Sequence, residues 1–127
     1  MYDEVHAMTI KADADALKAA RDWAGRIFET WGLDAYLGKL ITSELVGNVV
    51  KHTDVTEMIV RIYMADAGPV VEVEDSSPEL PEVRPLDSSS LSGRGLAMIE
   101  LLAAEVGWNP CAGGGKCVYA VIKQAAA

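Results

Sequence analysis

Apolar residues first recur at helical spacing near the N-terminus of the chain. Between residues 13 and 31 they follow one another at intervals of three and four, which predicts an amphipathic helix. Asp13 is a suitable N-cap for this helix, and Gly32 is a suitable C-cap. Ahead of the helix, hydrophobic and polar residues alternate roughly over residues 5–10, which predicts an edge strand.

A second helix and a pair of strands follow. Asp34 can cap a helix that runs from about residue 35 to residue 50. Residues 57–64 and 70–74 are rich in β-branched and other apolar residues, which predicts two strands. The turn residues at 66–68 lie between them, so we expect a hairpin.

The second half of the chain begins with a long connection. Residues 76–92 contain three prolines and a run of serines, and connections of this length are usually functional or disordered. A third helix is predicted from residue 96 to about residue 104. Two more strands are predicted at 105–109 and 116–122, joined through the glycines at 113–115.

This order of elements predicts an α+β fold, with helices stacked on one face of a largely antiparallel sheet. The chain has 127 residues, a length that suits one hydrophobic core. The sequence shows no internal repeat and no linker. We therefore expect a single domain over residues 1–127.

The net charge of the chain disfavours some classes of binding partner. The formal net charge is −8, and an acidic surface repels nucleic-acid phosphates and anionic lipids. We therefore expect no direct binding to nucleic acid and no binding to membranes. No segment approaches the roughly 20 apolar residues of a membrane span. The two cysteines, Cys111 and Cys117, form no CxxC pair, so we interpret them as reduced thiols in a cytoplasmic protein.

The second predicted helix carries polar residues on its apolar side. Glu44, Asn48 and His52 recur every four residues and so share one face. On a helical projection this face lies inside the apolar stripe, with Glu44 between Leu37 and Leu40. A charged group at a core position is costly unless it is paired or meets water, so the pattern indicates a polar cavity.

The chemistry of these side chains suits a hard cation and a proton acceptor. The neutral oxygen of Asn48 can bind a hard cation such as Mg²⁺, and Glu44 can accept a proton or orient a water molecule. The alternative is structural: Glu44 would pair with a basic residue and Asn48 would bond to the backbone. His52 taken alone fits a residue that caps the end of the helix.

Two further segments carry candidate binding groups. Gly93 and Gly95 flank Arg94 at a predicted helix start, where backbone N–H groups and the helix dipole favour an anion. A plain junction between loop and helix is the alternative. Asp75 ends a predicted strand and can accept a hydrogen bond from an exocyclic amine, or it can simply stabilise a turn. Lys116 follows three glycines but lacks Walker spacing, so we interpret this segment as a hairpin turn.

Four segments, taken in order, resemble the sequence boxes of the GHKL ATPase superfamily, which includes histidine kinases and gyrase-type ATPases. They are ELVGNVVKH at 44–52, VEDSSP at 73–78, GRGLAMI at 93–99 and GGKCVYA at 114–120. The resemblance covers the chain from about residue 13 to residue 122. The combination in this order is far more specific than any single box.

The resemblance implies a Bergerat-type two-layer sandwich, with helices on one face of a mostly antiparallel mixed sheet. It implies ATP and Mg²⁺ as cofactors and a lid at about residues 76–92. By position, Glu44 would be the catalytic general base, Asn48 the Mg²⁺ ligand and Asp75 the residue that binds the adenine amino group. The other nucleotide contacts implied are His52, Gly93, Arg94, Gly95, Leu96 and Cys117.

The sequence departs from the superfamily pattern at two places. Ser77 and Pro78 stand in the region where the first glycine box usually has glycines, and proline restricts the backbone there. Cys117 stands where a threonine is common. These departures affect the expected hinge of the lid and the contacts to adenine.

Within the superfamily, the chain looks closest to small actinobacterial anti-sigma-factor serine kinases. That resemblance implies transfer of the ATP γ-phosphoryl group to an anti-anti-sigma-type antagonist protein, with a sigma factor as a second candidate partner. It also leaves room for a homodimer. The alternative is a partner-sequestering module without catalysis, in which nucleotide binding is degenerate or purely structural. ATP hydrolysis as a conformational clock is disfavoured, because the chain has no room for transducer domains.

Overall fold

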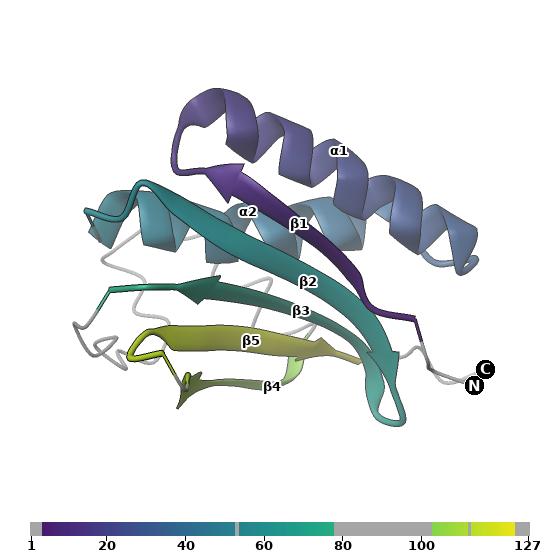
Figure 1. The fold of residues 1–127 in the computed structure, drawn as a ribbon. Helices are drawn as coiled ribbons and strands as arrows, with labels where there is room; N and C mark the ends of the chain where they lie inside the picture. Colours follow the sequence, from purple (N-terminus) through teal and green to yellow (C-terminus); the bar gives the residue numbers. More distant parts are fainter. Residues whose placement is uncertain (1–3, 53, 78–102, 112, 124–127) are drawn as a thin grey trace.

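The computed structural model describes residues 4–52, 54–77, 103–111 and 113–123, and every structural statement below concerns these residues. They form two helices and five strands (Figure 1). In chain order the elements are β1 (His6–Lys11), α1 (Ala14–Thr30), α2 (Ala35–His52), β2 (Glu57–Ala65), β3 (Gly68–Asp75), β4 (Ala103–Pro110) and β5 (Lys116–Ile122).

The first helix has the ends that the sequence predicts. The Asp13 carboxylate accepts a hydrogen bond from the backbone N–H of Ala16 at 2.8 Å, which satisfies one of the unpaired donors of the first turn. Beyond the last turn, Gly32 has a φ of 75°, a conformation that suits glycine. The buried residues of α1 lie on one side of the helix and are Ala20, Ala24, Gly25, Ile27 and Phe28.

The second helix packs closely on the first. It begins after Asp34, whose carboxylate accepts a hydrogen bond from the Tyr36 N–H at 2.9 Å, and it ends at His52, two residues beyond the predicted end. A side chain at Gly38 would place its Cβ 2.7 Å from Cδ1 of Phe28. Glycine at this position therefore allows the two helices to approach each other closely.

The strands form one sheet in the order β1-β2-β3-β5-β4, and every pairing described is antiparallel. The predicted α+β architecture is confirmed, whereas no parallel pair of the expected mixed sheet occurs among the described strands. In the β2–β3 hairpin, Ala65 pairs with Gly68, which leaves a turn of two residues.

The hydrophobic core lies between the sheet and the two helices (Figure 1). Its centre contains Phe28 from α1, Ile41 and Val46 from α2, and Val60 and Val71 from the sheet, all fully buried. Among the described residues, no helix combines the length and the apolar character needed to cross a membrane.

The third predicted helix is wrong at its C-terminal end. Ala103 and Ala104 belong to β4, and Ala103 pairs with Ile122 of β5, next to an irregularity in the ladder before Glu105. Pairing of β4 with β5 on both sides of Ala104 therefore overrides the helical preference of the two alanines. The rest of that predicted helix, residues 96–102, lies outside the described residues.

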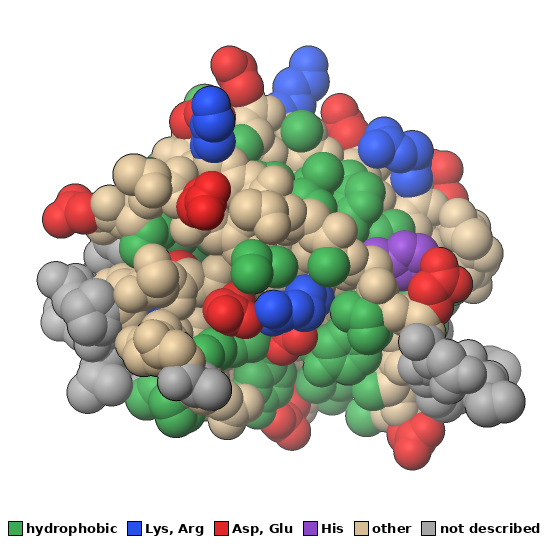
Figure 2. All heavy atoms as spheres, in the orientation of Figure 1, with side chains coloured by type: hydrophobic (Ala, Val, Ile, Leu, Met, Phe, Trp, Pro, Cys, Tyr) green, Lys and Arg blue, Asp and Glu red, His purple; other side chains and the backbone are tan. Residues whose placement is uncertain are grey.

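The sheet face turned away from the helices is not covered by any described element (Figure 1). Charged side chains of both signs meet at the middle of this face, and hydrophobic side chains lie beside them (Figure 2). Successive residues of each strand point to opposite faces of the sheet, so alternate residues lie on the open face and on the helix-covered face. That alternation decides which residues of β3 and β5 belong to the candidate site.

Candidate functional site

The flank of α2 carries the predicted catalytic and metal-binding residues. Glu44 and Asn48 are both half-buried and lie one helical turn apart. One carboxylate oxygen of Glu44, Oε2, is buried. Both residues border the buried face of the helix, and they are neither in bulk solvent nor sealed within the core.

The position of the apolar stripe on α2 differs from the prediction. The buried residues of this face are Gly38, Ile41, Thr42, Leu45, Val46 and Val49, whereas Leu37 and Leu40 are only half-buried. The centre of the core-facing side is therefore rotated away from Glu44 and Asn48. The rotation places these two side chains at the edge of the core, where polar groups are tolerated at lower cost.

Asp75 ends β3 on the face that is covered by the helices. Its side chain is fully buried, and its Oδ1 accepts two hydrogen bonds, from the Ser77 N–H at 2.9 Å and from Nζ of Lys116 at 2.9 Å. Its second oxygen, Oδ2, is also buried and has no hydrogen-bond partner among the described residues. A buried carboxylate oxygen without a donor is costly, so this atom is the best candidate in the site for binding a donor on a ligand.

Lys116 is the residue that the sequence reasoning missed. It is the first residue of β5 and pairs directly with Asp75 in the register of the β3–β5 ladder. Only 8% of its side chain is exposed, which is rare for lysine. Along β5, Val118, Ala120 and Ile122 share its face and are apolar, so a lysine at the head of this row is the signal that could have identified it.

The glycine turn between β4 and β5 places Lys116 against Asp75. The Cys111 N–H donates to the Gly115 carbonyl at 2.8 Å, and Gly114 has a φ of 94°. At Gly115 an added Cβ would lie 3.0 Å from the Asp75 carbonyl carbon and closer still to the carbonyl oxygen. The residue just before β5 therefore contacts the end of β3 so closely that only glycine fits.

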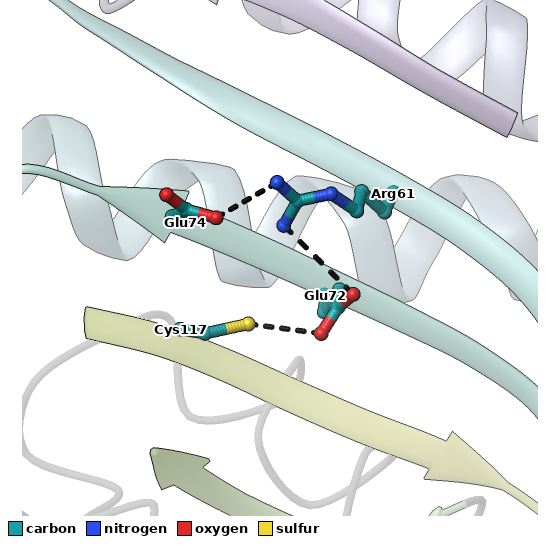
Figure 3. A network of polar contacts seen from close by, with 4 residues as sticks. All are labelled: Arg61, Glu72, Glu74 and Cys117. Carbon is teal, nitrogen blue, oxygen red and sulfur yellow. Dashed lines mark hydrogen bonds and ion pairs between the residues drawn. The ribbon is translucent and has the colours of Figure 1, made fainter. Parts of the chain in front are cut away.

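Cys117 lies on the opposite face of the sheet from Asp75. It pairs with Glu74, and its thiol donates a hydrogen bond to Glu72 at 2.9 Å (Figure 3). Burial, followed by this hydrogen bond, raises the pKa of the Cys117 thiol far above its usual range. The structure therefore brings Lys116, and not Cys117, to the predicted adenine-binding aspartate.

A charged network surrounds the Cys117 thiol on that open face. Arg61 of β2 forms an ion pair with Glu74 at 2.8 Å and a longer one with Glu72 at 3.9 Å (Figure 3). The hydrogen bond to Glu74 is the main cause that raises the pKa of Arg61. Both carboxylates thus interact with the single guanidinium of Arg61, and the thiol is held in its neutral form.

The ends of three elements bring the candidate residues to one end of the molecule. The C-terminal end of α2, the end of β3 and the start of β5 lie at the same end (Figure 1), and α2 packs against both strands. Several predicted nucleotide contacts lie outside the described residues: Gly93, Arg94, Gly95, Leu96 and most of the expected lid. The backbone of His52 belongs to α2, but its side chain is not among the parts described.

The described oxygen groups of the site suit Mg²⁺ bound to a nucleotide. The described residues contain no group of three or more His, Cys, Asp or Glu side chains that could hold a metal ion. Mg²⁺ is commonly held by one or two protein oxygens together with substrate phosphates. Asn48 can provide such an oxygen, and the buried Oδ2 of Asp75 fits the amine of a base.

Comparison with known proteins identifies one family. No curated protein matches the chain. The family model of the histidine kinase-like ATPase domain matches residues 10–122, which include α1, α2, every strand from β2 to β5, and the end of β1. Since this match spans most of the sequence, the chain belongs to the histidine kinase-like ATPase domain family.

Proposed function

We propose that this ATP-binding regulatory domain is a protein serine/threonine kinase of the anti-sigma-factor type. It transfers the γ-phosphoryl group of ATP to a serine or threonine of a small antagonist protein. Phosphorylation of the antagonist then releases or captures a second partner, for which a sigma factor is the leading candidate. The sequence motifs and the family support ATP binding, and the kinase step rests on Glu44.

The observation that carries this proposal is the position of Glu44. Its carboxylate has one buried oxygen, and Asn48 lies one turn further along the same flank of α2. A half-buried carboxylate at the edge of the core is suited to accept the proton of an incoming hydroxyl group. The two side chains lie on the helix that packs against β3, the strand that ends at Asp75.

Each residue has a separate role in this scheme. Asp75 binds the amine of the base through Oδ2, Asn48 provides an oxygen ligand for Mg²⁺, and Glu44 accepts the proton of the attacking hydroxyl. Mg²⁺, when bound, offsets the negative charge of the phosphates. Positioning of the hydroxyl and removal of its proton are the contributions that this chain makes to the reaction.

Phosphoryl transfer from γ-³²P-ATP to a purified candidate antagonist tests the proposal. The label should survive acid and be lost in alkali, as for phosphoserine, and it should disappear when the acceptor serine is changed to alanine. Glu44→Gln should reduce transfer by roughly 10²–10⁴-fold, typical of a lost general base, while ATP affinity changes little. Glu29→Gln, at an exposed position of α1, is the matched control and should transfer normally.

Two outcomes would refute the kinase assignment. One is tight binding of Mg-ATP by the wild type without transfer to any antagonist tested. The other is normal transfer by Glu44→Gln. Label that is stable in alkali but lost in acid would instead indicate a phosphohistidine product.

A second candidate function is partner sequestration without catalysis. It is favoured by Ser77 and Pro78, which stand in the region where the first glycine box usually has glycines. Calorimetry and thermal unfolding with Mg-ATP distinguish the two functions. Absence of both binding heat and a thermal shift would favour the sequestering module.

A further inference from the structure

The buried ion pair between Asp75 and Lys116 requires an explanation beyond stability. Asp75 is fully buried and Lys116 is almost so, and their charged atoms are 2.9 Å apart. Burying two charges costs about as much as their attraction returns, so such a pair is weak evidence for a purely stabilising role. At this position of β5 an apolar residue would continue the row of Val118, Ala120 and Ile122.

The hydrogen bonds of Asp75 are distributed unequally between its two oxygens. Oδ1 accepts from Nζ of Lys116 and from the N–H of Ser77, so two donors already occupy it. Oδ2 is buried and has no donor among the described residues. The carboxylate therefore presents one acceptor oxygen to a ligand, and as the anionic partner of an ion pair it presents no donor.

The unequal distribution has consequences for base recognition. The Watson–Crick edge of adenine offers one exocyclic amine that can donate to Oδ2. Guanine offers two adjacent donors, N1–H and the 2-amino group, which are best matched by both oxygens of a carboxylate, and it presents a carbonyl oxygen at C6. With a single acceptor oxygen, the carboxylate satisfies the adenine amine and leaves only the N1 acceptor of adenine unpaired, whereas guanine keeps one of its two donors and its C6 carbonyl unpaired.

We propose that Lys116 is a positioning residue for nucleobase selection: it engages Oδ1 of Asp75 and leaves Oδ2 as the single acceptor, so that adenine is bound and guanine is rejected. This inference rests on the assignment of Asp75 to the base in the proposed function. It goes further by assigning the selectivity to a lysine on the neighbouring strand. Without Lys116, both oxygens of Asp75 can turn toward the ligand and the advantage of adenine falls.

The test compares dissociation constants for Mg-ATP and Mg-GTP, measured by calorimetry on the full chain. The wild type should prefer ATP by about 100-fold or more. Lys116→Met keeps the length of the side chain but removes the donor, and it should reduce this preference at least about tenfold. Lys116→Gln keeps a donor for Oδ1 and should restore most of the preference. Lys123→Met, at an exposed lysine after β5, is the matched control and should behave as the wild type.

The ratio of the Mg-ATP and Mg-GTP affinities distinguishes a positioning role of Lys116 from a purely structural role. Loss of structural support would weaken both nucleotides by the same factor and leave their ratio unchanged. An unchanged ratio in Lys116→Met would therefore overturn the inference. Should that variant not fold, Lys116→Thr provides the same comparison, and an unchanged ratio there would overturn the inference equally.

The wild-type measurement also separates this inference from the proposed function. If the wild type binds neither nucleotide, the assignment of Asp75 to the base fails and both are refuted. If the wild type prefers ATP and every Lys116 variant keeps that preference, only the role of Lys116 is refuted.

Discussion

Gly115 provides a sharp test of how the end of β3 and the start of β5 fit together. In Gly115→Ala the new methyl group would lie 3.0 Å from the Asp75 carbonyl carbon and 3.0 Å from the Ser76 Cα, and closer still to the Asp75 carbonyl oxygen. All three are backbone atoms, so no side chain can rotate away. Ordinary contact begins at 3.4 Å, so relief of the contact with the carbonyl oxygen requires the two strands to separate by more than the roughly 0.4 Å that the two 3.0 Å contacts alone would need.

The size of the effect follows from this geometry. Overpacking in a rigid region costs about 1–3 kcal/mol, and the backbone contact places Gly115→Ala near the upper end of that range. Gly113→Ala is the matched control, because an added Cβ there meets nothing within 4 Å. Urea unfolding followed by tryptophan fluorescence should show a lower free energy of unfolding for Gly115→Ala by about 2–3 kcal/mol and a change below about 1 kcal/mol for Gly113→Ala.

The same substitution should weaken nucleotide binding. Separation of β3 and β5 moves Lys116 away from Asp75, because the two residues are cross-strand partners. We expect Mg-ATP affinity to fall in Gly115→Ala and to stay near the wild-type value in Gly113→Ala. Equal stability of the two variants would refute the close approach of the strands on which this reasoning depends.

Three further predictions concern groups outside the site. Because the pKa of the Cys117 thiol is raised in the folded state, the unfolded chain loses this proton first as pH rises through 9.0, the ordinary thiol value. The free energy of unfolding should therefore be insensitive to this group below that pH and fall above it. If Cys117→Ala showed the same fall above that pH, the fall could not come from the Cys117 thiol. Phe28→Ala removes a fully buried ring and should lower the free energy of unfolding by about 3–5 kcal/mol in urea titrations; a loss below about 1 kcal/mol would contradict its place in the core. Asp13→Ala should cost about 1 kcal/mol through loss of the helix cap, whereas the exposed Asp22→Ala should cost less, and equal costs would argue against capping.

Local signals in the sequence were sufficient for most of the fold. The periodicity of α1, its cap at Asp13 and the glycine after it depend on neighbouring residues, and the structure confirms them. The bounds of β5 were likewise predicted correctly. The failure at Ala103 and Ala104 has a tertiary cause, since both residues belong to β4, in which Ala103 pairs with Ile122 of β5.

The candidate site could be predicted only in part from the sequence, because it depends on which face of the sheet each strand residue occupies. In a strand, a shift of one residue changes the face on which every side chain lies. The family resemblance implied Cys117 as a nucleotide contact, whereas the ladder places Lys116 opposite Asp75 and Cys117 on the other face. The ion pair could not be predicted, because it requires the register between two strands separated by more than forty residues.

The central claim is that Asp75 binds the amine of an adenine base while Lys116 holds its other oxygen. A crystal structure of the full chain with Mg-ATP tests this most directly. We predict that the exocyclic amine of adenine lies about 3 Å from Oδ2 of Asp75, with Nζ of Lys116 still bonded to Oδ1. A base bound elsewhere, or an amine that makes no contact with Asp75, would contradict the account.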